Sequence, residues 1–174
     1  VTIEQVAPLG YTLDTSVHRF SVNGKSTDIP VVDDPGYIQL TIKKKDSDNN
    51  TGIASGDAKL EGAIYRVAYL ENGVTVTKDI TINASAIARL SNLPIGKLKV
   101  WEISAPIGYK LDSTVHVYDI KAHQVTSDIY ELEPEDFTED VFKGRISLHK
   151  QYETLDNLAE EQGAEFDVYL KSAG

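Results

Sequence analysis

The stretch Trp101-Glu-Ile-Ser-Ala-Pro-Ile-Gly-Tyr109 decides how the chain is organised, because most of it occurs a second time near the start. Residues 1–22 align with residues 99–120 at an offset of 98, and nine of the 22 positions are identical. The identical pairs begin with Glu4 and Glu102 and continue through an Ala-Pro-x-Gly-Tyr turn. A sequence that matches itself at a fixed spacing indicates tandem repeats.

A second pair of similar segments indicates where one repeat ends and the next begins. Residues 36–46 resemble residues 144–152, and each segment is followed by a Gly-Ala-x-aromatic element. The motifs therefore occur in the order end, start, end, start. We expect residues 1–35 to be the C-terminal part of a preceding repeat, residues 36–142 a complete repeat, and residues 143–174 the N-terminal part of a following one.

Composition favours strands and argues against several classes of function. Val, Ile and Thr make up 43 of the 174 residues, and β-branched side chains favour strands over helices. The net charge of −10 repels phosphate backbones and anionic lipid, which argues against nucleic-acid binding and membrane insertion. The chain has no Cys, which excludes disulfides and thiolate metal sites, and no Met, which suggests a segment of a longer protein.

Alternation of apolar and polar residues predicts short antiparallel strands separated by turn residues. The strands are expected within residues 38–42, 64–67, 74–76, 98–100 and 115–117. The single stretch that suggests a helix in the complete repeat is residues 83–90, about two turns long. The pattern as a whole predicts an all-β sandwich of seven or a similar number of strands.

The motifs resemble the Cna-B type repeat, also called the SpaA or prealbumin-like pilin domain. The resemblance rests on Leu60-Glu-Gly-Ala-Ile-Tyr65, on Leu93-Pro-Ile-Gly96 and on the Glu-x-x-Ala-Pro-x-Gly-Tyr element that occurs twice. It implies a tandem stalk of immunoglobulin-like sandwiches in a pilus subunit or adhesin, anchored outside the cell on a Gram-positive wall. The first and last strands of each sandwich should be adjacent and parallel. Adjacent repeats are the expected partners, and a host ligand would bind through other domains.

The resemblance also implies a self-formed isopeptide bond between a Lys on the first strand and an Asn or Asp on the last, promoted by a Glu. Lys44 shares a strand face with Ile42 and precedes Asp46 by two positions, so it is the inward-facing lysine. Glu102 shares a face with Val100, and burial there should favour its neutral form. A neutral Glu102 can polarise the partner carbonyl while Lys44 attacks it.

The partner of Lys44 is expected to be an aspartate, because no Asn occurs between Asn92 and Asn157. Asp140 is the favoured residue, since it would share a strand face with Phe142. Asp136 and Asp128 are weaker alternatives.

The flanking half-repeats carry equivalent residues. In the preceding repeat Glu4 is the expected promoter, and Asp33 or Asp34 is the expected partner of a lysine outside this chain. In the following repeat Lys150 is the expected lysine. The only chemistry expected is therefore a single intramolecular event, without a cofactor or metal, and not enzymatic turnover.

Other readings of these motifs and of the whole chain compete with this one. A lysine at a strand end is commonly a solvated edge residue. The segment from Asp46 to Gly52 superficially resembles a calcium loop, but a polar turn fits its spacing better. Trp101 could stack on a sugar or pack against a neighbouring repeat. The alternative function is a ligand-binding module that grips a host protein or glycan.

Overall fold

The computed structural model describes residues 1–21, 23–24, 28, 30–135, 137–148 and 165–166. The chain divides into two compact units, Val1–Val141 and Phe142–Gly174. All of the strands described below lie in the first unit. No described residue of the second unit, 142–148 and 165–166, belongs to a strand or helix.

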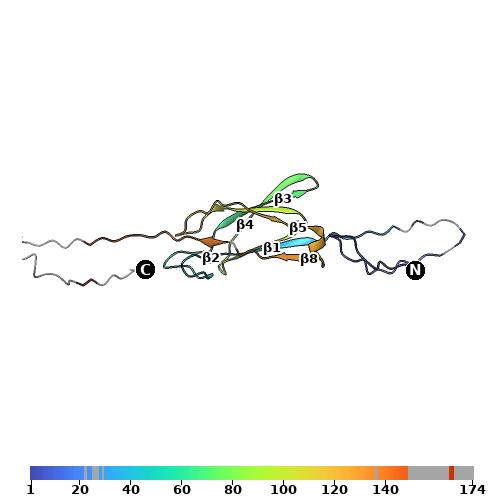
Figure 1. The fold of residues 1–174 in the computed structure, drawn as a ribbon, viewed down its shortest axis with the longest axis horizontal. Coiled ribbons are helices and arrows are strands. Elements are labelled where there is room, and N and C mark those ends of the chain that lie inside the picture. The colour runs from blue at the N-terminus through green and yellow to red at the C-terminus, as the bar shows by residue number, and fades with distance from the viewer. Residues whose placement is uncertain (22, 25–27, 29, 136, 149–164, 167–174) are drawn as a thin grey trace, which may run out of the picture. The chain divides into compact units, whose positions relative to one another are not determined.

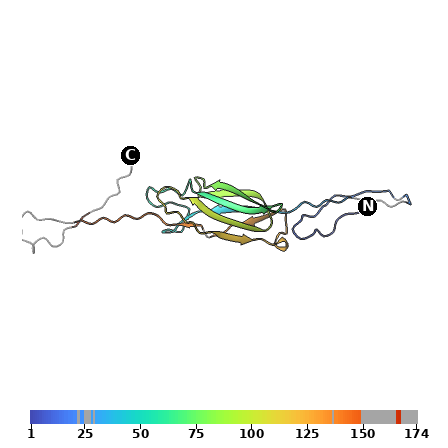
Figure 2. The same cartoon turned by 90° about the horizontal axis from the view of Figure 1, so that it is seen from above.

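The first unit contains a β-sandwich, seen from two directions in Figures 1 and 2. A three-stranded sheet has the order β5-β1-β8, with β1 (Tyr37–Lys43) between β5 (Ile87–Pro94) and β8 (Ile129–Leu132). A four-stranded antiparallel sheet has the order β4-β3-β6-β7, formed by β3 (Ile64–Glu71), β4 (Val74–Thr81), β6 (Lys97–Ser104) and β7 (His116–Asp119). The prediction of an all-β sandwich is confirmed.

The opening and closing strands of the sandwich run parallel and side by side. β1 pairs in parallel with β8, and Figure 1 shows the two strands next to each other. The pairing resumes further along, where β2 (Lys45–Asp46) pairs in parallel with β9 (Thr138–Glu139). This arrangement confirms that the opening and closing strands are adjacent and parallel. It also places β2 beside β9, the last strand of the sandwich.

The core follows the alternation seen in the sequence. Ile38, Leu40 and Ile42 of β1 are fully buried, and they face residues of the other sheet such as Val67 and Val100. Fully burying an aliphatic side chain of this size contributes about 1.5–3 kcal/mol to folding. The apolar face therefore holds β1 between the sheets and sets the phase of the residues that follow it.

The expectation of a helix at residues 83–90 is wrong. Asn83 caps a tight turn, because its side-chain oxygen accepts hydrogen bonds from the backbone N–H groups of Ser85 and Ile87 at 2.9 and 3.1 Å. Ala86 then has a positive φ of 58°, which breaks a right-handed helix. From Ile87 the chain forms β5 and pairs with β1, so tertiary pairing overrides the local preference.

Helical structure in the described part of the chain is limited to one 3-10 turn, η1 (Ala122–Gln124), between β7 and β8. No helix among the described residues is long and apolar enough to cross a membrane.

Candidate functional site: a buried lysine between two carboxylates

Lys44 occupies the position between β1 and β2, and its side chain is fully buried. Its Nζ atom lies 2.5 Å from Oε1 of Glu102 and 2.5 Å from Oε1 of Glu139, and it also donates to the Tyr65 hydroxyl at 2.9 Å. An ammonium group has three donors, and each of them has an acceptor here. The site therefore joins the opening strand, the central strand β6 and the closing strand β9.

The inward direction of Lys44 follows from strand alternation. Its neighbours Lys43 and Lys45 point away from the core and pair with Glu133 and Glu135 at 2.5 and 2.8 Å. These outer pairs are exposed on at least one side and contribute little to stability. The two pairs nevertheless join the opening part of the sandwich to its closing part at the positions on either side of Lys44, whose own side chain points inward.

Glu102 is held by a second group as well as by Lys44. Its Oε2 atom accepts a hydrogen bond from the backbone N–H of Asp112 at 3.0 Å, in the loop before β7. Hydrogen bonds from Thr114 lower the pKa of Asp112 and fix that loop. Glu102 is 2% exposed, and both of its carboxylate oxygens accept hydrogen bonds inside the sandwich.

Glu139 lies in surroundings that favour the protonated form of its carboxyl. Burial raises the pKa of its carboxyl, even though the contacts with Lys44 lower it. Its Oε1 atom accepts from Lys44 and from the Tyr65 hydroxyl at 3.3 Å, whereas its buried Oε2 atom has no partner among the described residues. One lysine between two ionised carboxylates would leave a buried negative charge, so a protonated Glu139 gives the cluster the lower electrostatic cost.

Aromatic rings close the cluster off from water. The Tyr65 ring lies 4.8 Å from Lys44 Nζ and packs edge-on against Phe137 at 5.1 Å between ring centroids. The His116 ring also packs against Phe137, at 4.9 Å between ring centroids. Burial and the adjacent carboxylates raise the pKa of Tyr65, so its hydroxyl stays protonated. The low dielectric of this enclosure strengthens every polar contact within it.

A second buried network lies next to the first. Asp46 of β2 accepts hydrogen bonds from the Tyr109 hydroxyl at 2.6 Å and from the Ser55 and Asp48 backbones at 3.0 and 2.8 Å. Burial alone would raise the pKa of Asp46, but these hydrogen bonds outweigh it and lower the pKa to about 2. Tyr109 belongs to the repeated Ala-Pro-x-Gly-Tyr motif, so this contact gives that motif a structural role.

The structure brings Lys44 and Glu102 together but does not bring Asp140 to them. The Asp140 side chain is 68% exposed and accepts a hydrogen bond from Ser47 at 2.9 Å. Asp140 is expected to point inward because it would share a strand face with Phe142, but Phe142 is itself 65% exposed. Phe137 and Glu139 are the inward residues here, at 2% and 1% exposure, and Glu139 lies one position before Asp140.

The two weaker candidates lie elsewhere. Asp128 precedes β8, where its carbonyl accepts from the Tyr37 backbone at the far end of β1. Asp136 lies outside the described residues.

Residues 1–34, which are expected from the sequence to belong to a preceding repeat, show hydrogen bonds that match those near Glu102. Glu4 accepts from the Asp14 backbone at 2.7 Å, as Glu102 does from Asp112. The Thr12 backbone donates to the Asp34 carbonyl, and the Lys110 backbone donates to the Asp140 carbonyl.

Asp34 therefore corresponds to Asp140, and Asp33 corresponds to Glu139. Asp33 has a buried Oδ1 atom without a partner among the described residues, as Glu139 has at Oε2. Of the two partners expected there, Asp33 is the one that corresponds to the inward-facing Glu139. Lys150 lies outside the described residues.

The segment from Asp46 to Gly52 forms a turn in which Asp46 accepts from Asp48, and Thr51 donates to Asn49. Among the residues that the structure describes, no group of three or more His, Cys, Asp or Glu side chains could hold a metal ion.

A β-sandwich whose opening and closing strands run parallel, with a buried lysine between them, fits a prealbumin-like domain. The family model described as "SpaA: Prealbumin-like fold domain" matches residues 38–133, which is more than half of the chain. The chain therefore belongs to the SpaA prealbumin-like family. No curated protein sequence gives a significant match.

Solved structures with a similar fold come from Gram-positive bacteria. The Bacillus anthracis TIE protein matches with a TM-score of 0.59 and 26% identity, over 80% of this chain and 24% of that one. The group B streptococcus pilus 2b backbone protein matches with a TM-score of 0.42 and 18% identity, over 68% and 46%. The major pilin SpaD of Corynebacterium diphtheriae matches with 0.41 and 19%, over 59% and 30%. The chain spans less than half the length of each of these proteins.

Proposed function

We propose that the chain is a load-bearing shaft segment of a Gram-positive pilus subunit or adhesin, attached to the cell wall, with adjacent repeats as its neighbours. The observation that carries this proposal is the parallel pairing of the opening and closing strands, with Lys44 between them. Pulling the two ends of such a domain apart loads the hydrogen bonds between parallel terminal strands in shear. Bonds loaded together resist more force than bonds that open one after another.

We further propose that Lys44 and the closing strand become covalently joined, and that Glu139 is the partner in place of Asp140. The neutral amine of Lys44 would attack the carbonyl carbon of protonated Glu139. An amide bond forms between Nζ and Cδ, the C–OH bond breaks, and one water leaves. Glu102 would take the proton from the amine and return it to the departing hydroxyl, which is general acid and base catalysis within one molecule.

The proposed amide is supported by the electrostatics of the cluster. The reaction replaces a buried amine and a buried carboxyl, whose charged forms are costly to desolvate, by one neutral amide and a released water. Burial of the cluster also keeps bulk water from hydrolysing the product. The event occurs once per chain, so it does not make the protein an enzyme.

Single-molecule stretching tests this function directly. When the chain is pulled from its termini, an amide between Lys44 and Glu139 prevents the segment between these two residues from extending. Their separation in the sequence is 95 residues. The wild-type domain should therefore lack a length increase of about 330 Å that these residues would otherwise release on unfolding. Lys44→Met should restore the increase. A wild-type chain that releases the full length would contradict the covalent shaft.

A second candidate function has one observation in its favour. A hollow of about 460 Å³ lies on the outer face of the four-stranded sheet, and Trp101, Lys99 and Ala68 are among the residues that line it. An aromatic ring beside two exposed lysines, Lys97 and Lys99, suits a sugar that carries a carboxylate. This is the ligand-binding alternative expected from the sequence.

The fluorescence of Trp101 reports on this candidate, because the chain contains one tryptophan. A saturable change in emission on titration with a sialylated oligosaccharide, lost in Lys99→Ala, would support binding. No change over a millimolar range would eliminate this candidate and leave the shaft function unaffected.

A further inference from the structure

The turn at Gly10 lies in unusually close contact with the 3-10 turn η1. A Cβ atom placed at Gly10 would lie 3.1 Å from Cβ of Ala122 and 3.3 Å from Cδ1 of Ile95. Gly10 is buried and has a φ of +84°, which a residue with a side chain rarely adopts. The approach is therefore a backbone contact that glycine alone permits.

Gly36 makes a second contact at the same place. Its backbone N–H donates to the Gly10 carbonyl at 2.8 Å, and a Cβ atom there would lie 2.7 Å from Cγ1 of Val125. Val125 follows η1 directly and is 8% exposed. Both glycines thus rest on the same short segment of the complete repeat.

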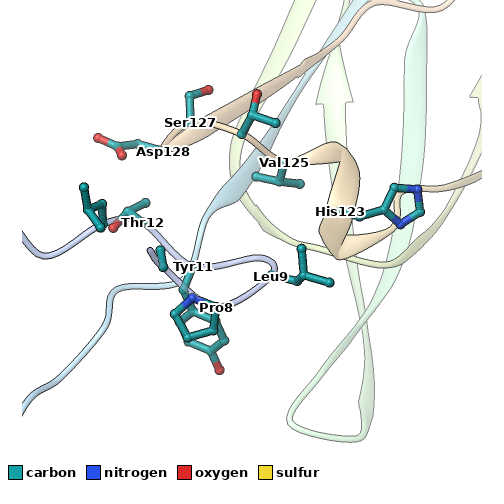
Figure 3. A pocket seen from close by; sticks show the side chains of 11 residues that line it. Pro8, Leu9, Tyr11, Thr12, His123, Val125, Ser127 and Asp128 are labelled. Atoms are coloured by element: carbon teal, nitrogen blue, oxygen red, sulfur yellow. The ribbon is translucent and has the colours of Figure 1, made fainter. Parts of the chain in front are cut away.

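Hydrogen bonds also tie the Gly10 turn to the connection that leads into β1. The Thr12 backbone donates to the Asp34 carbonyl at 2.8 Å, and Tyr11 forms a bridge with Pro35. Figure 3 shows the side chains of this turn and of the segment after η1 around a common hollow, which measures about 380 Å³. The hollow lies beside the places where Gly10 and Gly36 leave no room for a side chain.

We propose that the Ala-Pro-x-Gly-Tyr turn is a docking element, which seats the end of one repeat on η1 of the next and fixes their relative orientation. This inference rests on the proposed function as a tandem shaft and names the partner of the surface as the neighbouring repeat of the same chain. Without such a contact, repeats joined by a short connection move relative to each other. Gly108 is the glycine of the second copy of this motif and has a φ of +89°, but a Cβ atom there would lie 2.6 Å from Cβ of Ala58, so this copy of the turn packs on its own sandwich. The docking contact is seen for the Gly10 copy.

A matched pair of glycine substitutions tests the docking. Gly10→Val introduces a side chain into the contact with Ala122, whereas Gly24→Val introduces the same strain at a φ of +79° where nothing described lies within 4 Å. The readout is hydrogen exchange at the Gly36 amide, whose acceptor is the Gly10 carbonyl. Exchange should become about tenfold faster in Gly10→Val and stay unchanged in Gly24→Val, as expected for the loss of one docking contact.

A change on the opposite surface completes the test. Ala122→Arg should speed exchange at Gly36 as Gly10→Val does, and both variants should broaden the distribution of distances between labels on residues 1–21 and on β3, measured by electron spin resonance. Wild-type exchange in both variants, or equal acceleration in Gly24→Val, would overturn the docking. The intact mass should match wild type after correction for each substitution, so this outcome is independent of the proposed amide.

Discussion

Replacing Lys44 by Met tests how much the buried cluster contributes to stability. Methionine keeps most of the volume of the lysine stem but removes its ammonium, so neither the amide nor an ion pair can form. In the chain-entropy model a cross-link closing 95 residues restricts the unfolded chain by about 4.7 kcal/mol. Leaving Glu102 and Glu139 buried without their lysine adds to this loss, because an unpaired buried carboxylate must take up a proton.

The assay is chemical denaturation of the wild type, of Lys44→Met and of the matched control Lys43→Met. Lys43 is the adjacent lysine, and its pair with Glu133 is about half exposed on both sides, so the control should lose less than about 1 kcal/mol. Lys44→Met should lose at least about 4.7 kcal/mol, which for a domain of this size lowers the melting temperature by roughly 20 °C or more. Equal stability of the two variants would refute the reasoning.

Three further predictions concern the neighbours of Lys44. Glu102→Gln should leave the fold intact but prevent closure, so that its corrected intact mass exceeds that of wild type by one water, whereas the exposed control Glu135→Gln should keep the wild-type mass. The pKa of Asp46 is lowered from 3.8 to about 2 on folding, so the free energy of unfolding should fall as the pH drops through this interval, and Asp46→Asn should remove that part of the dependence in denaturation curves measured at stepwise pH. Tyr109→Phe removes the 2.6 Å hydrogen bond to buried Asp46 and should cost about 1–3 kcal/mol in the same assay, and a cost near zero would mean that the bond is not formed in solution.

The sequence predicts the sandwich because apolar alternation and repeated turn motifs act locally. Ile38, Leu40 and Ile42 are inward in the structure as their spacing indicates, and the same phase extends to Lys44. The position of Glu102 follows from the same reasoning on β6, where Leu98 and Val100 are also buried. Strand phase can be read wherever several apolar residues share a face.

The closing strand shows where this reasoning fails. β9 is two residues long, and the buried or partly buried apolar residues that set its phase are Phe137 and Val141, whereas Phe142, on which the sequence prediction relies, is exposed. A one-residue shift sends every side chain to the opposite face, so Asp140 replaced Glu139 in the prediction. The sequence prediction also allows only an aspartate as the partner of Lys44, which excludes Glu139. The alternation Phe137, Thr138, Glu139 was the signal that could have identified it.

The prediction of a helix at residues 83–90 is wrong for a different reason. Its residues tolerate a helix, but β1 has an open edge that β5 covers by pairing with it over residues 87–94. Long-range hydrogen bonding of this kind cannot be seen in a window of the sequence. The turn formed by Asn83 and Ala86, which has a positive φ, depends on that pairing.

The most direct test of the central claim is the intact mass of the wild-type protein, followed by fragmentation of its proteolytic peptides. The proposed amide predicts an intact mass that is one water lower than the mass calculated from the sequence, and a branched peptide in which Lys44 is joined to Glu139. A branch at Asp140 would return the partner to the residue expected from the sequence and contradict the register seen here. A chain at its full mass, with linear peptides containing Lys44 and Glu139, would contradict the covalent clamp.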